Sequence, residues 1–433
     1  MNHVSVIGAG MAGCEAAWQL ARRGIAVTLY ERKPVSFSPA HSSADFAELV
    51  CSNSLKAERM DSAAGLLKLE MAALGALLAP CAQACRVPAG GALAVDREAF
   101  SRMVTEKIAA EPRITVRREE LDDFPDGPVI VATGPLTADR LAARIAQLCG
   151  GSLHFYDAAA PIVTAASVDL DAAFYASRYE RGGESDYLNC PMNKEEYERF
   201  YEALVSAEGA PLHEFDAAPT VYEGCMPIEI MARRGADTIR FGPLKPVGLR
   251  DPRTGHRPWA AVQLRREDAA GTLYNLVGFQ TNLKFGEQKR VFGLIPALRH
   301  AEFARYGVMH RNTFMDSPRL LTGGFRFRAD DRLWFAGQMT GVEGYMESAA
   351  SGILAGINCA RALAGEPEWV LPPETMLGAL SRHVSASESA DFQPMGANFG
   401  ILPPLPERIR DKKARYTALA QRALDALHGA MPD

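Results

Sequence analysis

The sequence predicts an α/β protein in which a parallel sheet begins at the N-terminus and an α+β domain is inserted in the middle. Two observations near the N-terminus support the parallel sheet. A strand-like run, His3–Ile7, leads directly into the glycine-rich turn Gly8-Ala9-Gly10-Met11-Ala12-Gly13, and a helix-compatible segment follows at once. A second strand-like run, Ala26–Tyr30, ends on Glu31. Strands that alternate with helices in this way are typical of parallel sheets.

The glycine-rich turn has the spacing of a site for the pyrophosphate of a dinucleotide. Gly8 permits the tight turn, Gly10 lets the backbone approach the phosphates, and Gly13 lets the helix pack closely on the strand. The N-terminus of the helix supplies unpaired N–H groups. Glu31 lies where a carboxylate accepts hydrogen bonds from an adenosine ribose. An ordinary tight turn is the alternative, but the strands, glycines, helix and acid agree in order and spacing.

Two later strands indicate that the resident dinucleotide is FAD. Residues 129–135 and 333–337 are apolar strands that stop at small residues, among them Thr133, Gly134 and Gly337. In flavoproteins such strands return to the first sheet and bring glycines against the flavin. Residues 338–352 then lead into an alanine-rich helix whose small residues permit close approach to a flavin ring. The chain has no second complete glycine triplet, so NAD(P)H would bind only transiently.

The pattern along the chain divides it into three segments. We expect residues 1–155 to form the first part of a Rossmann-like FAD-binding domain of the glutathione-reductase type. Residues 156–324, with short apolar runs broken by Gly and Pro and a helix near 195–208, would form the inserted α+β domain. Residues 325–433 would return to the FAD-binding domain and end in a helix near 408–427.

Composition and cysteine content limit the class of protein. The chain has 433 residues, of which 48% are hydrophobic and 23% charged, as in an ordinary globular protein. No apolar run approaches membrane-spanning length, and the first apolar segment lacks the basic lead of a signal peptide, so we expect a cytoplasmic protein. The eight cysteines show no CxxC framework and no histidines at ligand spacing, so we expect thiols and no metal site.

Local charge favours RNA even though the net charge is −5. Between residues 233 and 257 there are seven Arg or Lys residues and two Asp, interleaved with Pro and Gly, and Arg265 and Arg266 extend this run. A second basic run at residues 408–415 has helical spacing. Each run is either a solvated face or an RNA-binding surface. The residues that we expect to contact RNA are Arg233, Arg234, Lys245 and Arg250.

Two cysteines are candidate reactive thiols because their neighbours favour turns. Cys51 is followed by Ser-Asn-Ser, and Cys225 follows a glycine and precedes Met-Pro. Turns expose thiols, and a nearby helix end lowers the pKa of a thiol. A small buried hydrophobic residue is the alternative for any cysteine, and it is favoured for Cys14, Cys149 and Cys359.

Several blocks of sequence resemble one enzyme family. They are the glycine turn with Glu31 and residues 39–41, 50–54, 86–97, 187–192, 241–249, 306–313, 341–345 and 398–404. Over nearly its whole length the chain resembles the TrmFO family of bacterial folate- and FAD-dependent tRNA (uracil-5-)-methyltransferases.

This resemblance implies a reaction and roles for particular residues. Methylenetetrahydrofolate would give its one-carbon unit to C5 of a T-loop uridine in tRNA, and reduced FAD would supply electrons. Because uracil C5 is a poor nucleophile, a thiolate is expected to add at C6. Cys225 would be this nucleophile and Cys51 the assisting thiol, although the two roles stay open. His310 would lie against the pterin ring, and Arg311 would pair with a folate carboxylate.

The expected FAD contacts combine the glycine turn with the return segments. They are Gly8, Gly10, Met11, Ala12, Gly13, Glu31, Arg32, Thr133, Gly134, Gly337, Glu343, Gly344 and Tyr345. A small-molecule FAD oxidoreductase is an alternative, but it would need neither the basic run nor two turn-placed cysteines. A related wobble-uridine flavoprotein would carry a longer C-terminal helical domain. A non-enzymatic RNA-binding flavoprotein and a disulfide reductase stay open.

Overall fold

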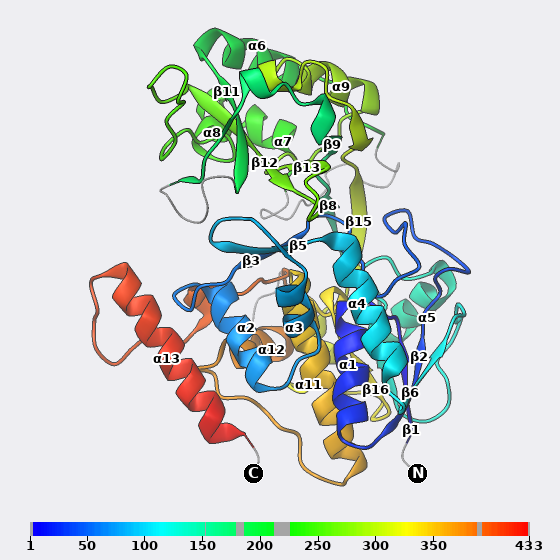
Figure 1. Cartoon of the computed structure of the whole chain (residues 1–433). Coiled ribbons are helices and arrows are strands. Elements are labelled where there is room, and N and C mark those ends of the chain that lie inside the picture. Colours follow the sequence, from blue (N-terminus) through cyan, green and yellow to red (C-terminus); the bar gives the residue numbers. More distant parts are fainter. Residues whose placement is uncertain (1–2, 152, 179–185, 212–225, 388–391, 432–433) are drawn as a thin grey trace.

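The computed structural model describes residues 3–151, 153–178, 186–211, 226–387 and 392–431. Figure 1 shows a lower body with a parallel sheet and most of the long helices, and an upper body with an antiparallel sheet. Both ends of the chain lie in the lower body. The predicted α/β class is confirmed.

The lower sheet has five parallel strands in the order β16-β7-β1-β2-β6. Their apolar residues are buried, as expected for a parallel sheet covered on both faces. The chain order reverses on either side of β1, and ligands bind at the carboxyl ends of strands beside such a switch point. The strands are β1 (His3–Ile7), β2 (Ala26–Tyr30), β6 (Ile114–Arg117), β7 (Val129–Val131) and β16 (Leu333–Phe335).

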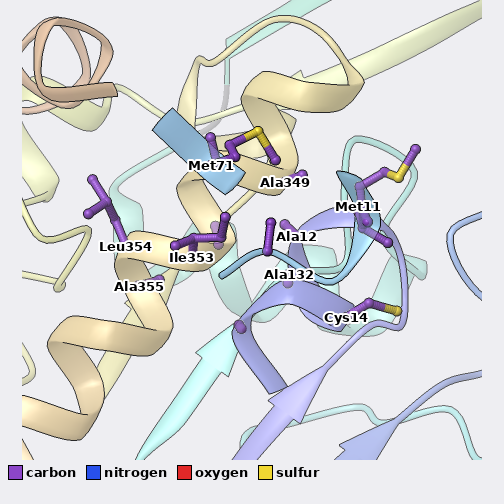
Figure 2. Close-up of a cluster of buried hydrophobic side chains, with 14 of the residues drawn as sticks. Met11, Ala12, Cys14, Met71, Ala132, Ala349, Ile353, Leu354 and Ala355 are labelled. Atoms are coloured by element: carbon purple, nitrogen blue, oxygen red, sulfur yellow. The ribbon is translucent and has the colours of Figure 1, made fainter. Parts of the chain in front are cut away.

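Helices α1 (Met11–Arg22) and α11 (Tyr345–Leu363) pack closely on one another, although they are far apart in the sequence. A Cβ atom on Gly352 would lie 2.1 Å from the Ala12 carbonyl oxygen, so only glycine allows this approach. Figure 2 shows the buried cluster at this contact, with Ala12 of α1 and Ile353 of α11. This packing brings the C-terminal segment against the glycine turn.

The other helices of the lower body complete its core. The last helix begins four residues later than the sequence pattern predicts, at Lys412, because Asp411 caps it by accepting a hydrogen bond from Ala414 N at 2.7 Å. No single helix in the described residues is long and apolar enough to span a bilayer. Helices α2 and α3 taken together have the length and composition of a span, but the chain bends by 115° between them. The remaining helices are α2 (Ala63–Ala73), α3 (Leu78–Ala84), α4 (Arg97–Ala110), α5 (Asp139–Cys149), α10 (Ser317–Leu320), α12 (Met376–Ala386) and α13 (Lys412–Ala430).

The upper sheet has six strands in the order β10-β11-β12-β13-β9-β14, and every neighbouring pair is antiparallel. Phe200, Phe279 and Phe292 lie in its core, with ring centroids 6.1 and 5.2 Å apart. The strands are β9 (Ile162–Thr164), β10 (Phe174–Tyr175), β11 (Tyr187–Met192), β12 (Ala260–Arg266), β13 (Leu273–Leu276) and β14 (Phe303–Arg305). The helices are α6 (Lys194–Val205), α7 (Ile228–Arg233), α8 (Ala236–Phe241) and α9 (Phe285–Phe292).

Two small ladders lie between the bodies (Figure 1). Strands β8 (Leu153–Ala158) and β15 (Met309–Phe314) pair antiparallel where the chain leaves and re-enters the lower body. Strands β3 (Ser54–Ala57), β5 (Ala92–Val95) and β4 (Arg86–Val87) form the second ladder. We retain the predicted domain boundaries near residues 155 and 324 as a proposal.

Candidate functional site

The glycine turn has the geometry of a dinucleotide cradle. Gly8 has φ +98°, and a Cβ there would lie 2.6 Å from the Ala132 carbonyl oxygen. A Cβ on Gly13 would lie 1.8 Å from the Gly8 carbonyl oxygen, so Gly13 permits the packing of helix on turn. Gly10 is different, because a Cβ there would meet nothing within 4 Å. Gly10 is also the N-cap of α1, and no side chain caps the helix, so its first N–H groups remain available to an anion.

A cavity of about 1140 Å³ opens over this turn at the carboxyl ends of β1, β2 and β7. Of the thirteen residues expected to contact FAD, ten line it; Gly13 lies behind the turn, and Glu343 and Gly344 line a neighbouring cavity. The ten are Gly8, Gly10, Met11, Ala12, Glu31, Arg32, Thr133, Gly134, Gly337 and Tyr345.

Glu31 already holds the walls of this cavity together. Its Oε2 accepts a hydrogen bond from Ala9 N and its Oε1 accepts one from Lys33 N, each at 2.9 Å. The buried carboxylate therefore fixes the turn after β1 to the end of β2. Each oxygen keeps a second lone pair, so acceptance of a ribose hydroxyl remains compatible with this role.

The residues present fit FAD. Gly10 and Gly134 both have open space where a Cβ would stand, so a cofactor can approach the backbone at two points of the cavity wall. Gly337 is held in a left-handed conformation with φ +88°, and its N–H donates to Ser351 Oγ at 2.7 Å. The sequence predicted glycines at these return segments, and they face the same cavity as the glycine turn.

A second cavity, of about 1230 Å³, adjoins the first and contains Cys51. The two cavities share lining residues, so a dinucleotide in the first would present one end to the second. The shared residues are Val50, Pro135, Leu136, Gln338, Tyr345 and Ser348. One of the two candidate thiols therefore lies at the end of the dinucleotide cradle.

Tyr345 positions Cys51. Its hydroxyl oxygen accepts hydrogen bonds from Val50 N at 2.9 Å and from Cys51 N at 2.8 Å, and it lies 3.0 Å from Cys51 Sγ. Burial, followed by the nearby Cys51 thiol, raises the pKa of the tyrosine well above its usual range. With both oxygen lone pairs occupied, the hydroxyl proton is left to donate toward sulfur. This arrangement stabilises negative charge on the sulfur, as a reactive thiol requires.

The segment after Cys51 is tied to the upper sheet by a buried arginine. Arg265 of β12 donates from Nε to Asn53 Oδ1 at 2.8 Å and from Nη2 to Ser52 Oγ at 2.9 Å. Asn53 in turn donates to the Val95 and Arg266 carbonyls at 3.0 and 2.9 Å. The site therefore depends on a contact between the inserted sheet and the cysteine segment.

This contact corrects one expectation from the sequence. Arg265 was expected to extend the exposed basic run, but it is 5% exposed, and burial lowers the pKa of its guanidinium. Beside it, Arg97 and the buried Glu267 form an ion pair with nitrogen and oxygen 3.0 Å apart. The available signal was the mostly apolar run that leads into Arg265 in strand β12, Ala260–Arg266, because a charge that is buried with such a run needs a specific partner.

We expect Arg265→Met to destabilise the protein by about 3 kcal/mol, because it leaves the Asn53 oxygen without its charged donor in a buried position. The melting temperature should fall. Arg265→Lys keeps the charge but cannot donate from two forked nitrogens, so it should recover only part of the loss. Wild-type stability in Arg265→Met, measured by thermal unfolding of the FAD-loaded protein, would contradict this role.

A further ion pair lines the second cavity and was missed by sequence reasoning. Lys56 Nζ donates to Glu347 Oε1 at 2.7 Å and to the Glu343 carbonyl at 3.4 Å. Lys56 has φ +64°, an unfavourable conformation for a residue with a side chain. Glu343 also accepts from Gln338 Nε2 at 2.7 Å, a local bond within the loop that leads into α11. Polar side chains at the start of the alanine-rich helix were the only signal for this network.

The other predicted site residues are described only in part. Cys225 lies outside the described residues. His310 and Arg311 lie in β15, of which the structure describes the backbone at these positions, opposite residues 157 and 156 of β8. Met309 pairs with Ala158, which lines the second cavity, so the backbone brings β15 to the edge of that cavity.

The basic run of the inserted body is exposed only in part. Arg233, Arg234 and Arg250 are exposed, and Lys245 is half-buried. Two other arginines of this run have partners: the Arg240 guanidinium lies 3.7 Å from the centroid of the Trp259 ring, and Arg253 pairs with Asp251 at 2.7 Å. The surface charge is therefore smaller than the sequence count suggests.

Comparison with known proteins decides the family. A family model described as "Glucose inhibited division protein A" matches residues 3–367. The protein of Pelotomaculum thermopropionicum named "Methylenetetrahydrofolate--tRNA-(uracil-5-)-methyltransferase TrmFO" is 58% identical over 426 residues, 98% of this chain and 97% of that protein. This chain belongs to the TrmFO family.

Other TrmFO proteins match over the same share of this chain. Those of Enterococcus faecalis and Halalkalibacterium halodurans are 56% and 55% identical, each over 98% of this chain and over 97% and 98% of their own lengths. Two crystal structures of Aquifex aeolicus GidA share the fold, with TM-scores of 0.71 and 0.68 at 15% and 16% identity. They cover 100% of this chain, which covers 74% and 76% of theirs. The resemblance to the TrmFO family is thus confirmed.

Proposed function

We propose that this chain is a tRNA (uracil-5-)-methyltransferase that forms 5-methyluridine in the T-loop, with methylenetetrahydrofolate as carbon donor and FAD as resident cofactor. The observation that carries this proposal is 55–58% identity over 98% of the chain to proteins named for that reaction. The site supports it, because a dinucleotide cradle opens into a second cavity that holds a candidate thiol.

The cradle residues would bind FAD along its length. The turn around Gly10 and the N-terminus of α1 would hold the pyrophosphate, and Glu31 the ribose of the adenosine. Gly134 and Gly337 would let the backbone approach the flavin ring. Bound FAD, once reduced by NAD(P)H, supplies the two electrons that convert the transferred one-carbon unit into a methyl group.

The two thiols would act on the uracil. A thiolate adds to C6 and raises the electron density at C5, C5 takes the one-carbon unit and loses its proton, and the thiolate then leaves. We assign this addition to Cys225 and an assisting role to Cys51, whose position Tyr345 fixes. His310 would stack on the pterin and Arg311 would pair with a folate carboxylate.

RNA contacts follow from the exposed charges. Arg233, Arg234, Lys245 and Arg250 would meet phosphates of the tRNA, which makes binding dependent on salt. Because the substrate is tRNA, we place the reaction in the cytoplasm.

The deciding experiment is transfer of labelled carbon from methylenetetrahydrofolate to an unmodified tRNA transcript, with FAD and NADPH present, followed by nucleoside analysis. We expect the label in 5-methyluridine, and none when the T-loop uridine is replaced by cytidine. No label with NADPH still oxidised would favour a small-molecule oxidoreductase. No label and no oxidation, with tRNA still bound, would favour a non-enzymatic RNA-binding flavoprotein.

A further inference from the structure

A second basic surface lies at the C-terminal end of the lower body, far along the sequence from the basic run of the inserted sheet. Residues 407–415 contain five cations and two acids. All five cations are exposed, and within the described part of the chain none forms an ion pair with a carboxylate. We name this set, Arg408, Arg410, Lys412, Lys413 and Arg415, the C-terminal basic cluster.

Hydrogen bonds and aromatic stacking fix the backbone around the cluster. Three of its members, Arg408, Arg410 and Arg415, line a groove of about 1420 Å³ between the proline-rich segment 402–406 and the start of α13. Arg422 of α13 donates to the carbonyls of Pro404 and Pro403 at 2.9 and 2.6 Å, which fixes the far wall. At the near wall the Phe399 and Tyr416 rings stack with centroids 4.4 Å apart. The buried face of α13, which includes Leu419 and Ala423, anchors the helix to the core.

The position of these cations is unfavourable for the free protein. Lys412, Lys413 and Arg415 lie in the first turn of α13, where the helix dipole favours negative charge, and that turn contains no acidic residue. Two further arginines precede the same helix end, so like charges repel each other there. Asp411 is occupied in capping the helix. An anion bound at this end would be favoured both by the dipole and by all five cations.

The segment that leads into the groove is hydrogen-bonded to the candidate site. Met395 N donates to the Gly341 carbonyl and Glu343 N donates to the Met395 carbonyl, each at 2.9 Å. Ala397 N donates to Glu347 Oε1 at 3.0 Å. Glu343 and Glu347 line the second cavity, and Ala397 is two residues before Phe399, the first residue that lines the groove. In Figure 1 the N-terminal end of α13 (red) is the upper end of the helix, the end nearer to the upper body.

We propose that the C-terminal basic cluster is a second RNA-binding surface, which binds the phosphate backbone of the tRNA whose uridine enters the second cavity. This inference rests on the proposed function, because it takes tRNA as the polyanion. A set of exposed cations that form no ion pair with the described part of the chain recognises phosphates by charge and without regard to base. The stacked Tyr416 ring, with the Lys412 ammonium 5.5 Å and the Arg415 guanidinium 5.3 Å from its centroid, holds two of the cations over one wall of the groove.

The test compares two triple variants of the full FAD-loaded protein. Lys412→Ala/Lys413→Ala/Arg415→Ala removes three cations of the cluster. Arg102→Ala/Lys107→Ala/Arg113→Ala removes three exposed cations, on α4 and the loop after it, that form no ion pair within the described chain. For an unmodified tRNA transcript we expect the first variant to raise Kd about tenfold or more and to reduce the slope of log K against log salt by about 2. The control variant should change neither.

A third variant separates binding from folding. Lys412→Glu/Lys413→Glu places acids in the first turn of α13, so we expect a melting temperature equal to or above that of the wild type while tRNA binding falls further. A lower melting temperature in this variant would show that the lysines stabilise the fold, and would overturn the proposal.

The outcomes also separate this proposal from the proposed function. If the wild type binds tRNA and forms 5-methyluridine while the alanine triple variant keeps the wild-type Kd and salt slope, only the second surface is refuted. If the wild type binds no tRNA, both proposals fail. An increase in Kd with an unchanged kcat at saturating tRNA would place the cluster in binding alone.

Discussion

Gly10→Val should yield a folded protein that no longer retains FAD. A Cβ at Gly10 meets no protein atom within 4 Å, and φ at this position is −77°, so the protein itself accommodates a side chain. The added atoms would instead occupy the space over the turn where the pyrophosphate approaches the backbone. Overpacking costs about 1–3 kcal/mol, so FAD affinity should fall by about five- to 150-fold. Flavin absorbance of the purified protein and a fluorescence titration measure this loss.

Two matched glycines make this result specific. Gly286→Val, in the exposed first turn of α9, also adds atoms to open space, and it should leave FAD bound. Gly13→Val puts a side chain 1.8 Å from the Gly8 carbonyl oxygen, so it should disrupt the turn itself and lower the melting temperature of the apoprotein. Full retention of FAD by Gly10→Val would mean that the pyrophosphate does not lie over this turn.

Cys225→Ala should abolish formation of 5-methyluridine and leave FAD bound. Without a thiolate to add at C6, uracil C5 stays a poor nucleophile, and we assign Cys51, the thiol that lines the second cavity, only an assisting role. Cys51→Ala should slow the reaction, because the hydroxyl of Tyr345 would lose the sulfur beside it. The readouts are labelled carbon in 5-methyluridine and the flavin absorbance of each variant.

A trapped complex distinguishes the two thiols. A tRNA with 5-fluorouridine at the target position cannot lose a proton from C5, so the thiol that has added to C6 stays attached and the complex survives denaturation. We expect this complex with the wild type and with Cys51→Ala, and none with Cys225→Ala. The reverse pattern would exchange the assigned roles of the two cysteines, and full activity in Cys225→Ala would remove it from the mechanism.

Local sequence was sufficient for the cradle and its strands. The predicted strands His3–Ile7 and Ala26–Tyr30 have the same bounds in the structure, because strand, turn and helix follow one another without a gap. Glycines at positions 8, 10 and 13 must satisfy constraints that arise within a few residues. The two return strands, ending near Gly134 and Gly337, were recognisable because buried parallel strands are continuous apolar runs. Helix ends were less well predicted, as α13 shows, since they depend on a single capping side chain.

Contacts between distant segments needed the tertiary structure. Nothing in the sequence places the Tyr345 hydroxyl against Cys51, or Arg265 against Asn53, because hydrogen bonds between residues so far apart are determined by packing. For the same reason Arg265 was read as part of an exposed basic run, although it is buried in the contact that holds the cysteine segment.

The sequence by itself thus determined the fold class, the dinucleotide cradle and the family, each of which depends on local spacing and short-range sterics. Only the tertiary structure decided that the cradle opens into the cavity of Cys51, and that some of the counted charges are neutralised while those at the start of α13 are free of ion pairs within the described chain. The physical reason is that burial and electrostatic pairing are properties of how elements pack, and a linear pattern of charges does not contain them.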